Sequence, residues 1–152
     1  MTAKSKKSPF VITYQALSRM SLLFYQTFGE EAIPAIRDAW YGMGLELGER
    51  LKAKRDITDF KSAAEAINDL SFKLDDLGGE LLELSENAYH FKTKSGQLCA
   101  VGLGDAGRPI CEAVMSVNRG QFKSTCGVDV YMNIIRSRAT GADCCEVIFS
   151  PG

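Results

Sequence analysis

The side chains of this chain that are best suited to chemistry are its cysteines, all of which lie beyond residue 98. They are Cys99, Cys111, Cys126, Cys144 and Cys145. Thiolates bind zinc and iron–sulfur clusters, and they also act as nucleophiles. The gaps between these cysteines are long and uneven, without a C-x-x-C pair, so their spacing does not support a zinc ribbon or knuckle. Two alternatives stay open: a zinc ion or an iron–sulfur cluster bound by cysteines from separate elements, or thiols that fill a core as small apolar side chains.

The adjacent cysteines introduce a strand-like segment that runs from residue 144 to residue 149. Neighbouring side chains of a strand point to opposite faces of a sheet. Cys145 then shares a face with Val147 and Phe149, so we expect it on the packed face. Cys144 is expected at a rim, against a partner chain or in solvent.

Cys111 is followed directly by Glu112, which places a potential nucleophile beside an acid. Adjacent residues of a helix do not face one another, so Glu112 is a poor direct base for Cys111. We expect Glu112 either to activate a water molecule or to be a surface carboxylate.

Two arginines, Arg136 and Arg138, are separated by one residue in a strand-like segment. This spacing predicts that they share a face of the strand. Together they are suited to bind a substrate carboxylate by bidentate hydrogen bonds. A solvated sheet surface is the alternative, because exposed charges contribute little to structure.

Two further features have structural explanations. The single histidine, His90, lacks the neighbours of a catalytic constellation, so a structural role is expected. The segment GLGDAG, residues 102–107, has the letters of a dinucleotide-binding loop. That loop requires a strand before it and a helix within it in a βαβ unit. Pro109 follows at once and the flanking segments indicate hairpins, so we interpret GLGDAG as a turn.

Hydrophobic periodicity predicts that the chain changes from helices to strands near its middle. Helices are expected over 10–28, from Ile33 onward and over 58–76, strands over 80–85, 88–94, 128–138 and 144–149, and a short helix over 108–117. This order predicts an α+β fold in which N-terminal helices pack on one face of an antiparallel sheet of four or more strands.

Three glycines weaken the second expected helix, Gly42, Gly44 and Gly48. A glycine lets another backbone or a ligand approach closely, because it has no Cβ atom. We interpret all three as sites of close helix packing. Thr58 is expected to cap the third helix.

Length and charge limit the class of protein. With 152 residues, we expect a basic, disordered tail over 1–9 and a single α+β domain over 10–152. The net charge of −1 argues against the large basic surface that binds nucleic acid. No stretch approaches the roughly 20 apolar residues that span a bilayer. We therefore expect a cytoplasmic protein without nucleic-acid or membrane partners, whose cysteines need not form disulfides.

The C-terminal pattern resembles two families of small domains. Cys99, the Cys111–Glu112 pair and the segment IIRSRATGADCCEVIF resemble the L-2-amino-thiazoline-4-carboxylic acid hydrolase family, as does ELGERL at 46–51. The ending shared with that family consists of Gly141, Asp143, Cys145, Val147 and Phe149. The same ending is similar to that of 4-vinyl reductase domains, which bind small molecules and whose cysteines can hold zinc.

The resemblance implies a 4-vinyl reductase-like fold and two alternative functions. The first is a homodimeric binding module that holds a metal, an iron–sulfur cluster or an apolar small molecule through Cys99, Cys111, Cys126 and Cys144 or Cys145. The second is a hydrolase that opens a thiazoline-type ring at its C=N bond. There Cys111 or Cys145 would be the nucleophile or metal ligand, Glu112 or Asp129 the proton carrier, and Arg136 or Arg138 the carboxylate anchor.

The number of thiols favours the binding module. Cys126 and Cys144 have no counterpart in the family pattern and would add thiolates to a metal site. A metal that is saturated with thiolates has no open position for a water molecule. A third alternative is an interaction subunit whose cysteines lie in the core.

Overall fold

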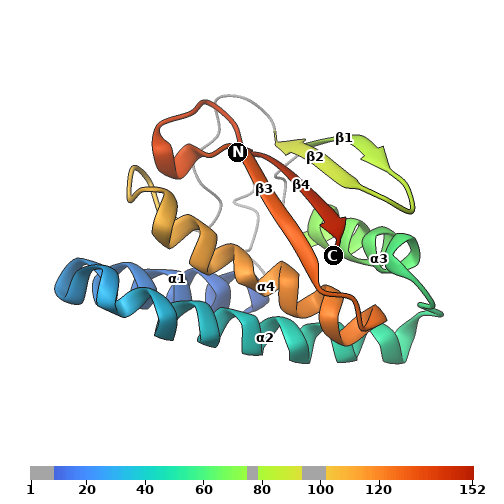
Figure 1. Cartoon of the computed structure of the whole chain (residues 1–152). Helices are drawn as coiled ribbons and strands as arrows, with labels where there is room; N and C mark the ends of the chain where they lie inside the picture. The colour runs from blue at the N-terminus through green and yellow to red at the C-terminus, as the bar shows by residue number, and fades with distance from the viewer. Residues whose placement is uncertain (1–8, 75–78, 94–101) are drawn as a thin grey trace, which may run out of the picture.

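The computed structural model describes residues 9–74, 79–93 and 102–152 (Figure 1). The tail up to residue 8 and Cys99 lie outside these residues. The elements in chain order are α1 (Pro9–Phe28), the 3-10 turn η1 (Gly29–Ala32), α2 (Ile33–Lys54), α3 (Phe60–Leu74), β1 (Gly79–Leu84), β2 (Tyr89–Thr93), α4 (Arg108–Cys126), β3 (Val130–Arg136), the 3-10 turn η2 (Arg138–Thr140) and β4 (Glu146–Pro151).

The strands form one antiparallel sheet in the order β1-β2-β4-β3. The last strand is therefore central, and β3 is an edge strand. Helix α4 lies between α2 and the β3–β4 part of the sheet, and α3 lies beneath the β1–β2 hairpin (Figure 1). The expected α+β fold, with helices packed on a four-stranded antiparallel sheet, is confirmed.

Aromatic side chains join the sheet to α3 and α4. The ring of Phe122 on α4 stacks on Phe60 with centroids 5.0 Å apart and contacts Phe149 at 5.7 Å. Tyr89 is paired with Phe149 across the sheet and donates its hydroxyl hydrogen to Oδ1 of Asn68 at 2.9 Å. Burial and the nearby Asp69 raise the pKa of the Tyr89 phenol, so this hydroxyl stays protonated in the folded chain.

Helices α2 and α4 pack backbone to backbone. A Cβ atom added to Gly44 would lie 2.0 Å from the carbonyl oxygen of Val117, and one added to Gly120 would lie 2.2 Å from that of Tyr41. Gly48 is in a similar position, with the Ser124 hydroxyl 1.9 Å from an added Cβ. The prediction of close packing is confirmed for Gly44 and Gly48. It is wrong for Gly42, around which the space is open.

The same packing explains why α4 extends to Cys126, beyond the short helix expected over 108–117. An interior glycine costs a helix about 1 kcal/mol relative to alanine, which argues against helix at Gly120. That glycine instead lies against the backbone of α2, so the close contact compensates for its low propensity.

Helix α1 contacts α2 at the buried side chain of Trp40. Trp40 is fully buried, and its indole Nε1 donates to Oγ of Ser21 at 2.9 Å. The ring of Tyr14 meets Trp40 edge-on with centroids 4.9 Å apart. The cap of the third helix lies one residue later than expected: Asp59, not Thr58, accepts the Ser62 amide hydrogen, at 2.8 Å.

The α2–α4 packing predicts opposite effects for two neighbouring glycines. Gly44→Ala should lower the free energy of unfolding by about 1–3 kcal/mol, because the new methyl group overlaps the backbone of α4. Gly42→Ala, on the same helix but in open space, should be neutral or stabilise by up to about 1 kcal/mol. Urea unfolding followed by circular dichroism measures the free energy of unfolding of both variants. Equal changes in the two would contradict the close backbone contact between α2 and α4 at Gly44.

Candidate functional site

The structure divides the cysteines among separate places. Cys111 and Cys126 lie near opposite ends of α4, about 22 Å apart along the helix axis. Since thiolates coordinate zinc at about 2.3 Å, these two sulfurs cannot bind the same ion. In the described part of the chain, no group of three or more His, Cys, Asp or Glu side chains is placed to hold a metal ion.

Cys111 and Cys145 contact neighbouring residues of one segment between β3 and β4. The Cys111 sulfur lies 3.2 Å from Oγ of Ser137. The backbone amide of Arg138 donates to the Cys145 sulfur at 3.5 Å. Cys111 and Arg138 are both buried and Cys145 is half-buried, so both sulfurs lie beside the Ser137–Arg138 segment, near the N-terminal end of α4.

The expected orientation of the adjacent cysteines is wrong. Cys144 is buried, at 2% exposed, whereas Cys145 is half-buried. Strand β4 begins only at Glu146, and residues 143–144 form a bend. The alternation of a strand therefore does not extend to Cys144, and the bend turns its side chain inward.

The proposed catalytic pair points in two directions. Cys111 is directed toward Ser137, while the exposed Glu112 accepts a hydrogen bond from Nε of Arg108 at 2.8 Å. Asp129, the other candidate proton carrier, pairs with Lys123 at 2.9 Å beyond the far end of α4. That pairing raises the pKa of Lys123 through the Asp129 hydrogen bond and charge.

The prediction that Arg136 and Arg138 share a face is wrong. Arg136 is the last residue of β3 and is exposed, whereas Arg138 lies in η2 and is 6% exposed. The strand stops because Ser137 caps η2, accepting the Ala139 amide hydrogen at 3.1 Å. The two side chains therefore do not extend from one face of β3, which is the arrangement on which the expected carboxylate site was based.

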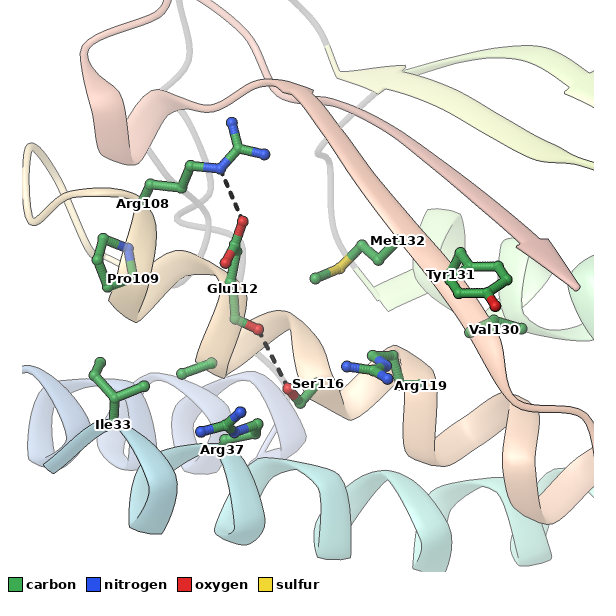
Figure 2. Close-up of a pocket in the computed structure, with 11 residues that line it drawn as sticks. Ile33, Arg37, Arg108, Pro109, Glu112, Ser116, Arg119, Val130, Tyr131 and Met132 are labelled. Carbon is green, nitrogen blue, oxygen red and sulfur yellow. Dashed lines mark hydrogen bonds and ion pairs between the residues drawn. The ribbon is translucent and has the colours of Figure 1, made fainter. Parts of the chain in front are cut away.

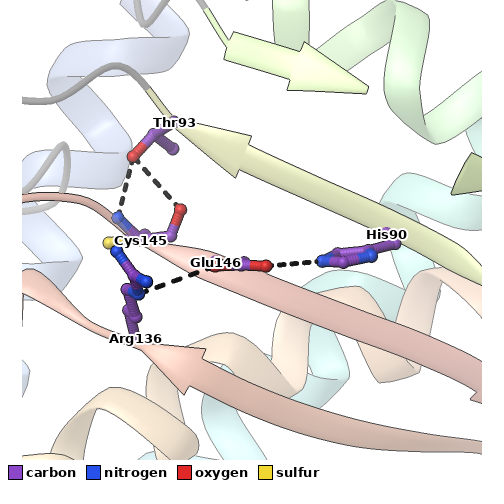
Figure 3. A network of polar contacts seen from close by, with 5 residues as sticks. All are labelled: His90, Thr93, Arg136, Cys145 and Glu146. Carbon is purple, nitrogen blue, oxygen red and sulfur yellow. Dashed lines mark hydrogen bonds and ion pairs between the residues drawn. The ribbon is translucent and has the colours of Figure 1, made fainter. Parts of the chain in front are cut away.

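His90 belongs to a polar network across the sheet (Figure 3). Its Nε2 lies 2.8 Å from Oε1 of Glu146, whose Oε2 lies 3.7 Å from Nε of Arg136. Next to it, the Cys145 amide donates to Oγ1 of Thr93 at 2.9 Å. These contacts connect β2, β4 and β3, which fits the structural role expected of His90.

The segment 102–107 is a turn with left-handed glycines at 102, 104 and 107. Helix α4 starts immediately after it, at Arg108. The interpretation of GLGDAG as a turn is confirmed.

A cleft of about 540 Å³ opens between α2, α4 and β3 (Figure 2). Its lining residues are Ile33 and Arg37 of α2, Arg108, Pro109, Glu112, Ala113, Ser116 and Arg119 of α4, and Val130, Tyr131 and Met132 of β3. The α4 residues recur every three or four positions, so they form one face of that helix. Part of the wall is apolar and part carries charges.

Within the cleft, the polar groups of α4 are connected to each other. Arg108 is paired with Glu112, and Oγ of Ser116 donates to the backbone carbonyl oxygen of Glu112 at 3.2 Å (Figure 2). Arg37 and Arg119 are exposed, and neither forms an ion pair with another residue that the structure describes. The cleft therefore carries a net positive charge.

Sequence reasoning missed this cleft. A signal for it exists: Arg108, Glu112, Ser116 and Arg119 recur at helical spacing. The helix that the sequence predicts ends at residue 117 and does not include Arg119. Nothing in the sequence indicates that Arg37, more than 70 positions earlier, lies across the cleft.

None of the helices in the described residues is long and apolar enough to cross a membrane.

No family model matches the chain, and no curated protein sequence matches it significantly. Several solved structures share its fold, among them a trafficking complex subunit and a sensory domain. Trafficking protein particle complex subunit 3 from Naegleria fowleri, covalently bound to palmitic acid, aligns with a TM-score of 0.61 and 16% identity over 93% of this chain and 96% of that chain. The phenol-responsive sensory domain of the transcription activator PoxR, with phenol, aligns with a TM-score of 0.57 and 16% identity over 91% and 74%. At these identities the likenesses show the fold alone.

Proposed function

We propose that this chain is a small-molecule-binding domain whose ligand lies in the cleft between α2, α4 and β3. The observation that carries the proposal is the cleft itself. Its volume of about 540 Å³ lies within the range of roughly 300–1,000 Å³ that is typical of ligand sites. It also combines an apolar wall with a few polar groups, as such sites do.

The wall of the cleft suits a ligand with an apolar body. Ile33, Pro109, Val130 and Met132 supply apolar surface, and the Tyr131 ring stands at the rim with 71% of its surface exposed. An exposed aromatic ring is available to cover a ligand, since aromatic contacts stabilise by about 0.5–1.5 kcal/mol beyond burial.

The two structural neighbours support the same class of ligand. Palmitic acid and phenol, the molecules in those two structures, both have an apolar body and few polar atoms. A 4-vinyl reductase-like domain, which the C-terminal pattern suggests, would also bind small molecules. For this chain, we propose that the ligand resembles a fatty acid or a phenol in having an apolar body and few polar atoms.

A second candidate function is thiolate binding of zinc or an iron–sulfur cluster at Cys111 and Cys145. The observation that favours it is the contact of both sulfurs with the Ser137–Arg138 segment. Cys99 lies outside the described residues, and Cys126 is too distant to contribute to such a site.

The alternative of a thiazoline hydrolase receives less support. Glu112 and Asp129 both pair with cations away from Cys111. Neither carboxylate is therefore placed to move a proton to or from that thiol.

We also propose that the chain forms a homodimer through α1. One face of this helix packs on Trp40, and the other exposes a second apolar stripe. The stripe consists of Ile12, Met20, Leu23, Phe24 and Phe28. Exposed stripes of this kind mark interaction sites. A twofold contact places the same patch of two copies together, and an apolar helix face is complementary to itself.

The ligand proposal predicts that the cleft residues control binding. A panel of benzoate, benzamide, octanoate and octanamide should include at least one compound that binds, as measured by isothermal titration calorimetry. Tyr131→Ala should weaken that binding roughly two- to tenfold, because an aromatic contact is lost. Ile135→Ala is the matched control, an exposed apolar residue of the same strand outside the cleft. If no compound binds, or if both variants behave alike, the cleft is not the ligand site.

The thiolate proposal predicts metal in the purified protein. After anaerobic purification, elemental analysis should find zinc, or iron with a broad visible absorption band. Cys111→Ser should lower the metal content, whereas Cys126→Ser should leave it unchanged because that thiol lies at the far end of α4. Wild-type protein without either metal would rule out this second function.

The dimer proposal predicts twice the chain mass in sedimentation equilibrium. Leu23→Asp should yield monomers, because it places a charge in the centre of the apolar stripe. Leu82→Asp, an exposed leucine on β1, should leave the dimer intact. A monomeric wild-type chain at every concentration tested would contradict the proposal.

A further inference from the structure

Three guanidinium groups line the cleft, but the cleft contains one carboxylate. Arg37 comes from α2, and Arg108 and Arg119 come from α4. Glu112 pairs with Arg108 at 2.8 Å and so compensates one positive charge. Within the described part of the chain, the other two guanidinium groups have no carboxylate within ion-pair distance.

The position of the two remaining arginines suits recognition of an anion. Figure 2 shows Ser116 between Arg37 and Arg119, with both guanidinium groups at the cleft wall. A guanidinium presents a planar fork of N–H donors that matches a carboxylate or a phosphate. Like charges in a concave site also raise the local potential, which attracts an anion and is relieved when one binds.

The other polar groups and the apolar wall of the cleft determine which uncharged part of a ligand fits. The hydroxyl of Ser116 is already used as a donor to Glu112, so the arginines are the main donors available. The Arg108 guanidinium is already paired with the Glu112 carboxylate, so that part of the cleft attracts an anion less strongly. The apolar side chains of Ile33, Val130 and Met132 provide surface for a carbon skeleton.

We infer that the ligand is a small organic anion, in which a carboxylate or phosphate group binds Arg37 and Arg119 and an apolar body lies against β3. The inference rests on the proposed function, because it specifies the ligand of the same cleft. A nucleic acid does not fit the charge pattern: the chain has a net charge of −1, so the positive charge at the cleft is local.

The spacing of the two arginines is held by the fold. Arg37 and Gly44 share α2, and Arg119 is the neighbour of Gly120 on α4. The glycine contacts fix how far apart these helices lie. The backbone positions from which the two arginine side chains extend are therefore fixed relative to each other.

The test compares compounds that differ in charge and hardly in shape. Benzoate is compared with benzamide and octanoate with octanamide by calorimetry on the full chain, and octyl phosphate is added to separate carboxylate from phosphate recognition. The anion of a pair should bind at least about tenfold more tightly than its amide, as expected for hydrogen bonds to charged groups. That preference should decrease at high salt.

Variants then identify the groups responsible. Arg37→Gln and Arg119→Gln should each reduce the preference for the anion roughly tenfold while leaving the affinity for the amide unchanged. Arg50→Gln is the matched control, an exposed arginine of α2 outside the cleft. Circular dichroism of the three variants checks that each keeps the fold of the wild type.

The outcomes separate this inference from the proposed function. Selective loss of anion binding in the two cleft variants supports both. Equal binding of acid and amide, unaffected by either arginine, overturns the anion inference and leaves small-molecule binding in place. A chain that binds none of the five compounds overturns both.

Discussion

The architecture depends on the close contact between α2 and α4. At Gly44, Gly48 and Gly120 there is no room for a Cβ atom, because the backbone or a side chain of the facing helix occupies that space. Helices that approach through glycines pack their backbones more closely than larger side chains permit. The contact therefore determines where α4 lies, and every other layer of the domain is attached to α4 or α2.

Each face of this helix pair has a separate role. Toward the sheet, Phe122 of α4 joins the aromatic cluster that holds β2, β4 and α3. Toward α1, Trp40 of α2 provides the buried indole on which that helix rests. Along their open side, the two helices and the edge strand β3 leave the cleft. The candidate ligand site is thus a consequence of the same packing that forms the core.

The cysteines show that residues suited to one site by their type can lie in different places in the fold. Their number and their restriction to the second half suggested one thiolate site. The fold places Cys126 at the far end of α4 from Cys111 and buries Cys144 in a bend, so only Cys111 and Cys145 meet at a common segment among the described residues. Spacing along the chain is a poor guide here, because a helix converts 15 positions into about 22 Å while a turn brings distant residues together.

By itself, the sequence determined the order of helices and strands, the α+β class and the turn over 102–107, because hydrophobic periodicity and glycines act locally. It also indicated the close packing at Gly44 and Gly48, although Gly42 carries the same signal and has room for a Cβ atom. Only the tertiary structure decided that α4 continues through Gly120, that Arg136 and Arg138 separate at the end of β3, and that Arg37 and Arg119 line one cleft. Those features depend on contacts between segments far apart in the chain, whose energies outweigh local preference and cannot be read from spacing.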